Sequence, residues 1–206
     1  MTTDYAPTVL AIDGTPIETP KATAGIGYVK TAIQQPQGKT FTATKTSEGT
    51  SWGAVYAQFL QKTSDIEQSG SGITVKRELL VTGKSGNSPY TVLSGSSDLK
   101  VGDRIKVRIT IETTRDIDFV QVVDRRAACM EPVRQLSGYH NGAYVSPKDF
   151  ATYYYYGGLA KGKYTMETEY FVDRAGQYET GTCTVQCAYA PEYRATAPST
   201  TLTIKE

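Results

Sequence analysis

The stretch RIKVRITIE, from Arg104 to Glu112, decides the fold class because it alternates between polar and apolar side chains. Apolar residues occupy every second position, and charged or hydroxyl side chains stand between them. A period of two is typical of a β-strand that buries one face. The same alternation recurs in DFVQVVD (118–124), KYTMETEYFVD (163–173) and CTVQCAY (183–189).

Glycine and proline divide the rest of the chain into short segments. Earlier strand candidates are Thr8–Ile12, Gly27–Ile33 and Thr40–Lys45. Short strands separated by turn signals predict an all-β protein, specifically an antiparallel β-sandwich. In WGAVYAQFLQK (52–62), three apolar residues could share one face of a helix, but alternation fits nearly as well, so both readings stay open.

A boundary is expected at the Ser-Gly-Ser-Gly run at positions 69–72, which is polar and flexible. It predicts a smaller β-rich part-domain over residues 1–72 and a larger β-sandwich domain over residues 73–206. The first piece is near the lower size limit for independent stability.

Charge and hydropathy exclude several classes of partner. The chain has 22 Lys and Arg against 21 Asp and Glu, a net charge of +1, so no long-range field steers it to nucleic acid or an anionic membrane. No apolar run approaches the roughly 18–20 residues that a membrane-spanning helix needs. The start, Met1 to Tyr5, has no signal-peptide pattern. A cytosolic protein and a mature fragment of a longer exported chain both remain open.

Patterns for nucleophilic catalysis and phosphate binding are incomplete. His140 is the only histidine, and it lies in the turn-rich stretch LSGYHNGAY with no nucleophile-elbow motif to support a triad, so we interpret it as a surface residue. The stretch VTGKSGNS (81–88) contains Gly-Lys-Ser, but Glu78 occupies the position of the upstream glycine of a phosphate-binding loop. We therefore expect no enzyme activity and no cofactor.

The acidic residues form no metal-binding pattern either. Asp116, Asp118 and Asp124 alternate with arginines in RDIDFVQVVDRR, without the central glycine of a calcium loop. We interpret them as charged residues at strand ends.

The three cysteines are expected to be structural. If CTVQCAY is a strand, the Cα atoms of Cys183 and Cys187 are about 13 Å apart, too far for a disulfide. Cys129 and His140 lack the spacing of further zinc ligands. Cys129 could pair with one of the other two in an exported protein, and all three could be buried thiols in a cytosolic one.

From Leu99 onward, six motifs follow one another in a fixed order: VGD (101–103), RD (115–116), FVQVVDRRAACMEP (119–132), SGY (137–139), KDFATYYYYGGLAKGKY (148–164) and YAPEY (189–193). Together they resemble the last macroglobulin-like domain of bacterial alpha-2-macroglobulin-like proteins. The preceding stretches IGYVKTAI (26–33) and TSWGAVYAQFL (50–60) are similar to the segment that returns from the thioester domain of this family.

This resemblance implies a function in protease trapping. In the family, cleavage of a bait region triggers collapse, and a Cys–Gln thioester attaches the protease. The thioester needs Cys-x-Glu-Gln, and none of the three cysteines is followed by it. The resemblance therefore implies a non-catalytic C-terminal fragment that is periplasmic, cell-surface or extracellular. Its partners would be the thioester domain and other domains of the same parent chain and, through the parent, proteases.

The resemblance also implies two sets of site residues. The cysteines depart from the family pattern at two landmarks, which implies a disulfide between Cys129 and Cys187. In the run Tyr153, Tyr154, Tyr155 and Tyr156, alternate side chains would face the core and the solvent. The outward tyrosines would then form a docking surface for the thioester domain.

Two alternatives remain. An independent immunoglobulin-like adhesion or carbohydrate-binding module would be supported by an exposed aromatic platform or a bound calcium ion. A hydrolase would need a cleft that converges on His140 or on a pair of acidic residues.

Overall fold

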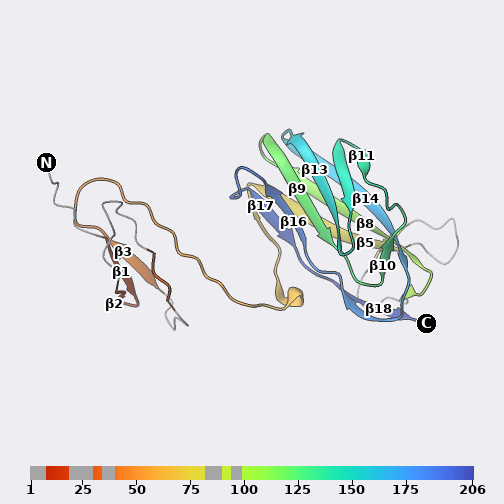
Figure 1. The fold of residues 1–206 in the computed structure, drawn as a ribbon, viewed down its shortest axis with the longest axis horizontal. Helices are drawn as coiled ribbons and strands as arrows, with labels where there is room; N and C mark the ends of the chain where they lie inside the picture. The colour runs from red at the N-terminus through yellow and green to blue at the C-terminus, as the bar shows by residue number, and fades with distance from the viewer. Residues whose placement is uncertain (1–7, 19–29, 34–39, 82–89, 94–98) are drawn as a thin grey trace. The chain divides into compact units, whose positions relative to one another are not determined.

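The computed structural model describes residues 8–18, 30–33, 40–81, 90–93 and 99–206. The chain divides into two units, Met1–Gln58 and Phe59–Glu206. The first unit contains a small antiparallel sheet with the strand order β2-β1-β3 (Figure 1). Its strands are β1 (Val9–Ile12), β2 (Thr15–Pro16) and β3 (Phe41–Thr44).

The second unit is a sandwich of two antiparallel sheets, which confirms the predicted fold class (Figure 1). Its seven-stranded sheet has the order β11-β12-β13-β9-β16-β17-β4, and its five-stranded sheet the order β10-β14-β8-β5-β6. A third, small sheet has the order β15-β18-β7, in which β18 runs parallel to β7.

A 3-10 turn, η1 (Thr63–Asp65), precedes the sandwich. The strands are β4 (Ser69–Ser71), β5 (Ile73–Val81), β6 (Thr91–Val92), β7 (Leu99–Lys100), β8 (Arg104–Thr113), β9 (Ile117–Arg125), β10 (Met130–Pro132), β11 (Gly138–His140), β12 (Ala143–Pro147), β13 (Ala151–Leu159), β14 (Gly162–Val172), β15 (Gly176–Glu179), β16 (Cys183–Cys187), β17 (Arg194–Ala197) and β18 (Thr201–Lys205).

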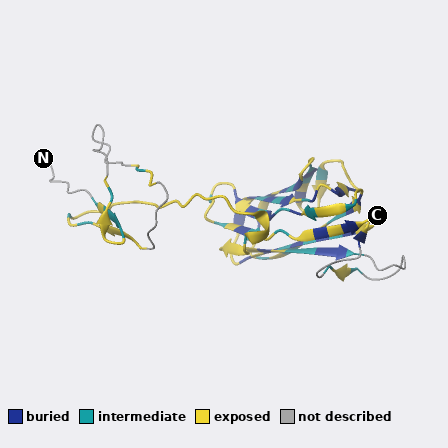
Figure 2. Cartoon of the chain, turned by 90° about the horizontal axis from the view of Figure 1, so that it is seen from below, coloured by how far each residue is buried: buried dark blue, intermediate teal, exposed yellow. Residues whose placement is uncertain are grey.

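The core lies between the two large sheets and follows the alternation of the sequence. In β8, which pairs with β5 on one side and β14 on the other, the apolar residues at 105, 107, 109 and 111 are buried. They pack with the inward residues of β9 and β16, such as Val122 and Val185. Figure 2 shows the result as buried and exposed positions that alternate along the strands of the sandwich.

The outer face of the five-stranded sheet is covered by paired charges. Nε of Arg108 lies 2.7 Å from Oε1 of Glu167, and Nζ of Lys106 lies 3.1 Å from Oε2 of the same residue. The hydrogen bond from Arg108 holds the pKa of Glu167 below its usual value. Lys106 also lies over the ring of Tyr90, whose hydroxyl donates to Glu169. Charges that pair with one another at a strand surface are typical of a solvated face.

The boundary between the units differs from the predicted one. The Ser-Gly-Ser run is not a linker, because it forms β4 and pairs with β17 of the sandwich. Gly72 ends this strand with a φ of +68°, and a Cβ there would lie 2.5 Å from the ring of Tyr193. Glycine is required at this position because it tolerates positive φ and leaves room for the ring. The chain therefore separates at Gln58 rather than at Gly72.

Segments before the sandwich depart further from the sequence-based expectations. Residues 52–62 form neither a helix nor a strand, and Trp52 within them is 94% exposed. Residues 30–33 of the strand candidate Gly27–Ile33 are not in a strand. The rest of that candidate, and most of the VTGKSGNS loop, lie outside the described residues. No helix among the described residues is long and apolar enough to cross a bilayer.

Candidate functional site

Phe119 is the most unusual residue of the seven-stranded sheet. Its φ is +52°, a conformation that is rare for a bulky side chain and costs about 1–3 kcal/mol. The alternation of buried and exposed residues shifts by one position here. Ile117 and Val120 are both buried although they are three positions apart, whereas a regular strand buries every second residue. On the neighbouring strand β13, Gly157 and Gly158 lie beside this point. As a result the phenyl ring projects to solvent and is 54% exposed.

Tyr189 contacts Phe119 from the segment that follows β16. The two rings meet edge to face with their centroids 5.1 Å apart. The strand β16 ends at Cys187, and Tyr189, two residues further on, is 81% exposed. The amide of Ala188 donates to the carbonyl oxygen of Phe119 at 2.9 Å, which fixes the two segments side by side. We call Phe119 and Tyr189 the aromatic knob.

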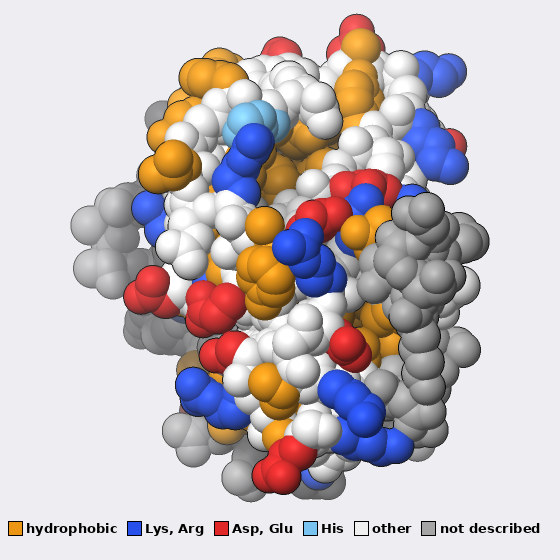
Figure 3. All heavy atoms as spheres, turned by 90° about the vertical axis from the view of Figure 1, so that its right-hand side faces the viewer, with side chains coloured by type: hydrophobic (Ala, Val, Ile, Leu, Met, Phe, Trp, Pro, Cys, Tyr) orange, Lys and Arg blue, Asp and Glu red, His pale blue; other side chains and the backbone are white. Residues whose placement is uncertain are grey.

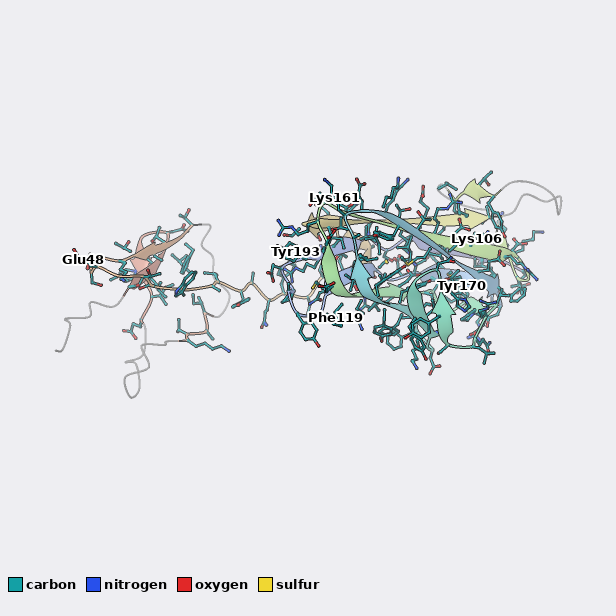
Figure 4. The ribbon with its side chains drawn as sticks, turned by 90° about the horizontal axis from the view of Figure 1, so that it is seen from above. Glu48, Lys106, Phe119, Lys161, Tyr170 and Tyr193 are labelled. Carbon is teal, nitrogen blue, oxygen red and sulfur yellow. The ribbon has the colours of Figure 1, made fainter. Side chains whose placement is uncertain are left out.

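A shallow groove lies on each side of the aromatic knob. One, of about 320 Å³, is lined by Asp116, Ile117, Cys187 and Tyr193 as well as by the knob. The other, of about 330 Å³, is lined by Gln121, Tyr155 and Gln186 together with the knob. Phe119 and Tyr193 lie at the same end of the sandwich, away from Tyr170 (Figure 4). The first groove also carries the carboxylates of Asp116 and Asp118, whereas no charged residue lines the second.

The tyrosine run of β13 alternates in the structure, but only half of it is available for docking. Tyr154 and Tyr156 are 2% and 6% exposed and belong to the core, so these two of the four candidate residues are not available for docking. Tyr153 and Tyr155 point outward, with their rings nearly parallel and 6.1 Å apart. Burial raises the pKa of Tyr154 well above its ordinary value, as expected for a core phenol.

Further aromatic rings extend this outward face toward its edge. Tyr144 of β12 is the cross-strand partner of Tyr155, and its ring meets that of Tyr139 edge to face. Phe150 contacts Tyr153 in the same manner. Aromatic residues at the centre of an exposed face are enriched in interfaces, whereas the other outer face of the sandwich is covered by ion pairs.

The three cysteines are buried free thiols, and the Cys129–Cys187 disulfide is not formed in this structure. Cys187 is opposite Val120 near the start of β9, and its thiol donates to the carbonyl oxygen of Asp118 at 3.1 Å. Cys129 follows the other end of β9 and lies beside the end of β14, where its carbonyl oxygen accepts from Asp173. The two cysteines are therefore at opposite ends of the sandwich, too far apart for a bridge.

We expect all three thiols to resist alkylation in the folded protein at pH 8 and to react after unfolding in denaturant. Burial raises the pKa of Cys129, and raises that of Cys183 well above its usual value, so neither thiol is ionised at this pH. Mass spectrometry after iodoacetamide treatment measures the outcome. A disulfide-linked peptide pair containing Cys129 and Cys187 would contradict this arrangement.

The acidic residues have separate structural roles. Asp116 accepts a hydrogen bond from the amide of Lys161 at 2.7 Å. Asp124 is not a strand-end charge, because it points into the core, fully buried, and Nε of Arg77 lies 3.0 Å from its Oδ1. Burial raises the pKa of Asp124 although Arg77 and Arg126 lower it. Among the described residues, no cluster of three or more His, Cys, Asp or Glu could hold a metal ion.

His140 lies at the surface, as predicted. Its ring contacts Nη1 of Arg134, and the histidine is visible beside a basic side chain in Figure 3. Of the site residues proposed from the sequence, the outward tyrosines of β13 belong to the exposed aromatic face. The aromatic knob escaped sequence reasoning because a positive φ at Phe119 and the end of β16 have no clear sequence signal.

The strain at Phe119 predicts an unusual substitution pattern. Asparagine tolerates positive φ better than alanine does, so Phe119→Asn should be more stable than Phe119→Ala by about 0.5–1 kcal/mol. Both variants lose the ring contact with Tyr189 equally. Urea unfolding followed by circular dichroism measures the difference, and equal stability of the two variants would show that residue 119 is not strained.

These observations define a class of fold, an immunoglobulin-like antiparallel sandwich that carries exposed aromatic rings on the outer face of one sheet. The model of the bacterial alpha-2-macroglobulin MG10 domain matches residues 72–192, which is more than half of the chain. The chain belongs to this family, and the resemblance inferred from the sequence motifs is confirmed.

Solved structures show the same fold. A Salmonella alpha-2-macroglobulin point mutant matches with a TM-score of 0.58 and 20% identity, over 68% of this chain and 10% of that one. Trypsin-activated alpha-2-macroglobulin from Escherichia coli matches with a TM-score of 0.56 and 17% identity, over 68% and 11%. A native E. coli piece from domain MG7 to the C-terminus matches with a TM-score of 0.56 and 18% identity, over 69% and 25%. No curated protein sequence matches. The chain thus spans about a tenth of the full-length structures that it matches.

Proposed function

We propose that this chain is the non-catalytic C-terminal part of a bacterial alpha-2-macroglobulin-like protease trap, and that its sandwich is a docking module for another domain of the same parent. The observation that carries the proposal is the aromatic knob, an exposed Phe119–Tyr189 pair held out by a strained backbone. A strained backbone conformation persists only where the surrounding contacts hold it in place. Such conformations cluster at functional sites.

The length of the matching structures supports this proposal. Because the chain covers about a tenth of the full-length structures it matches, most of a parent of that size would lie outside this chain and could cover the knob. The docked element would be the thioester domain. The E. coli protein in one matching structure is activated by trypsin, so the parent of this chain would likewise respond to proteases. Such a trap would work in the periplasm or at the cell surface.

The docking surface consists of the aromatic knob, with Tyr153 and Tyr155 at its edge. Docking would bury rings that are exposed in this chain, and burial of apolar area contributes roughly 25 cal/mol per Å² before the costs of association. Tyrosine and phenylalanine are suited to this because they provide large rigid contact areas.

The test is binding in trans. This chain should co-elute in size-exclusion chromatography with the thioester domain expressed from the parent gene, and the complex should dissociate when the knob is removed. Absence of a complex at concentrations of about 100 μM, which corresponds to a binding free energy weaker than about −5.5 kcal/mol, would contradict the docking role. A parent gene without any thioester or bait segment would contradict the trap assignment itself.

A further inference from the structure

A row of outward side chains crosses four strands of the seven-stranded sheet, next to the aromatic knob. Tyr144 of β12 is paired with Tyr155 of β13, Tyr155 with Gln121 of β9, and Gln121 with Gln186 of β16. Cross-strand partners point to the same face, so these four side chains lie in line. With neighbouring strands about 4.8 Å apart, the row is about 14 Å long. We call it the cross-strand row.

The two halves of the cross-strand row have different chemistry. Tyr144 and Tyr155 provide exposed rings, of which Tyr155 is 40% exposed. Gln121 and Gln186 follow with amide groups that make no side-chain hydrogen bond within the described part of the chain. None of the four side chains is charged, and the first charge along the line is Arg194, the partner of Gln186 on β17.

The groove of about 330 Å³ lies over three members of this row, Tyr155, Gln121 and Gln186. Its lining combines the rings of Tyr155, Phe119 and Tyr189 with both glutamines. Small-molecule sites combine apolar and aromatic walls with a few well-placed polar groups in this way. The aromatic knob forms one wall of the groove and Tyr155 the other.

We propose that the cross-strand row binds a neutral, linear oligosaccharide of pyranose units. The apolar C–H faces of pyranose rings stack on aromatic rings, and their hydroxyl groups donate to and accept from primary amides. The strand spacing of about 4.8 Å is close to the length of one pyranose unit, so successive units would meet successive side chains of the row.

The two amides favour this ligand over an apolar protein surface. A hydrophobic partner placed over Gln121 and Gln186 would bury both amides without replacing their hydrogen bonds to water, which is unfavourable. A hydroxyl-rich ligand supplies these bonds. The absence of charge in the row disfavours phosphate-bearing and other strongly anionic ligands. Because Phe119 and Tyr189 border the groove, a bound oligosaccharide and a docked domain would compete.

Isothermal titration calorimetry of the full chain with cellohexaose, xylohexaose, mannohexaose and chitohexaose tests this proposal. We expect at least one of these sugars to bind. Tyr155→Ala and Gln186→Ala should each weaken that binding by about tenfold, the effect of one good contact. Gln186→Glu keeps the shape of the side chain but replaces its amide with a carboxylate, and it should weaken sugar binding as well.

Phe150→Ala is the matched control, because Phe150 is an exposed ring on the same face outside the row. It should bind as the unchanged chain does, and all variants should keep the native circular dichroism spectrum. Failure of all four sugars to bind would overturn the proposal, as would equal weakening by Phe150→Ala. If the thioester domain bound in trans while no sugar did, the row would belong to a protein interface only.

Discussion

Replacement of Asp124 by alanine is expected to destabilise the sandwich by about 3–5 kcal/mol, the largest stability effect of any single substitution considered. Asp124 is fully buried, and its partner Arg77 is 3% exposed at the side chain. Without the carboxylate, the guanidinium stays in the core with no opposite charge at 3.0 Å. Arg77 extends from β5 to the other sheet, where it also donates to the carbonyl oxygens of Arg125 and Gly181. Losing Asp124 therefore weakens the link between the sheets.

The double variant Arg77→Leu/Asp124→Leu should be less destabilised than the sum of the two single variants. Burial raises the pKa of Asp124 despite two nearby arginines, as expected for a carboxylate that has lost its hydration in the core. Removing both charges removes the cost of desolvation, although two carbonyl oxygens lose a donor. A double-mutant cycle should give a coupling of about 1–3 kcal/mol.

Urea unfolding followed by far-ultraviolet circular dichroism is the suitable measurement. Fluorescence of the single tryptophan, Trp52, would report on the first unit instead. The pair Lys76–Glu78 on the same strand is the matched control because the Lys76 side chain is 66% exposed, and Lys76→Ala should change stability by less than about 1 kcal/mol. A cost below 1 kcal/mol for Asp124→Ala would show that the buried pair does not hold the sheets together.

Removal of the aromatic knob should weaken docking to the thioester domain by about 30-fold or more, the effect of an interface hot spot of 2 kcal/mol. The variant to use is Phe119→Asn with Tyr189→Ser, since both positions are exposed and asparagine relieves the strain at 119. The sandwich should remain folded, so that the effect appears in binding alone.

Tyr139→Asn is the control for this second prediction. Tyr139 is as exposed as Tyr189 but lies on the edge strand β11, away from the knob. Its replacement should change the dissociation constant less than threefold in surface plasmon resonance. Equal losses for the knob variant and for Tyr139→Asn would place the docking surface elsewhere on the sandwich.

The fold was predictable where one periodic signal ran along a whole strand. The alternation in β8, β9, β14 and β16 predicted both the strands and their buried faces. Alternation also predicted that two of the four tyrosines in β13 face the core. A strand with one buried face has an apolar residue at every second position, so the sequence alone predicts both the strand and its buried face.

The candidate site was less predictable because it depends on departures from that pattern. Phe119 projects outward through a positive φ, and Tyr189 does so because β16 ends two residues earlier. The Ser-Gly-Ser run has the composition of a linker, but pairing with β17 makes it a strand. The partner of Asp124 is Arg77, which is far away in sequence, rather than one of the adjacent arginines. Each of these features depends on contacts between residues that are distant in sequence, and a local sequence pattern does not predict such contacts.

The most direct test of the docking function is the solvent accessibility of Tyr189 in the intact parent protein. Hydroxyl-radical footprinting with mass spectrometry measures it for the parent and for this chain alone. Tyr189 is 81% exposed in this chain, so it should be oxidised readily here and at least about tenfold more slowly in the intact parent, where the docked domain covers it. Equal oxidation rates in the two proteins would contradict the account.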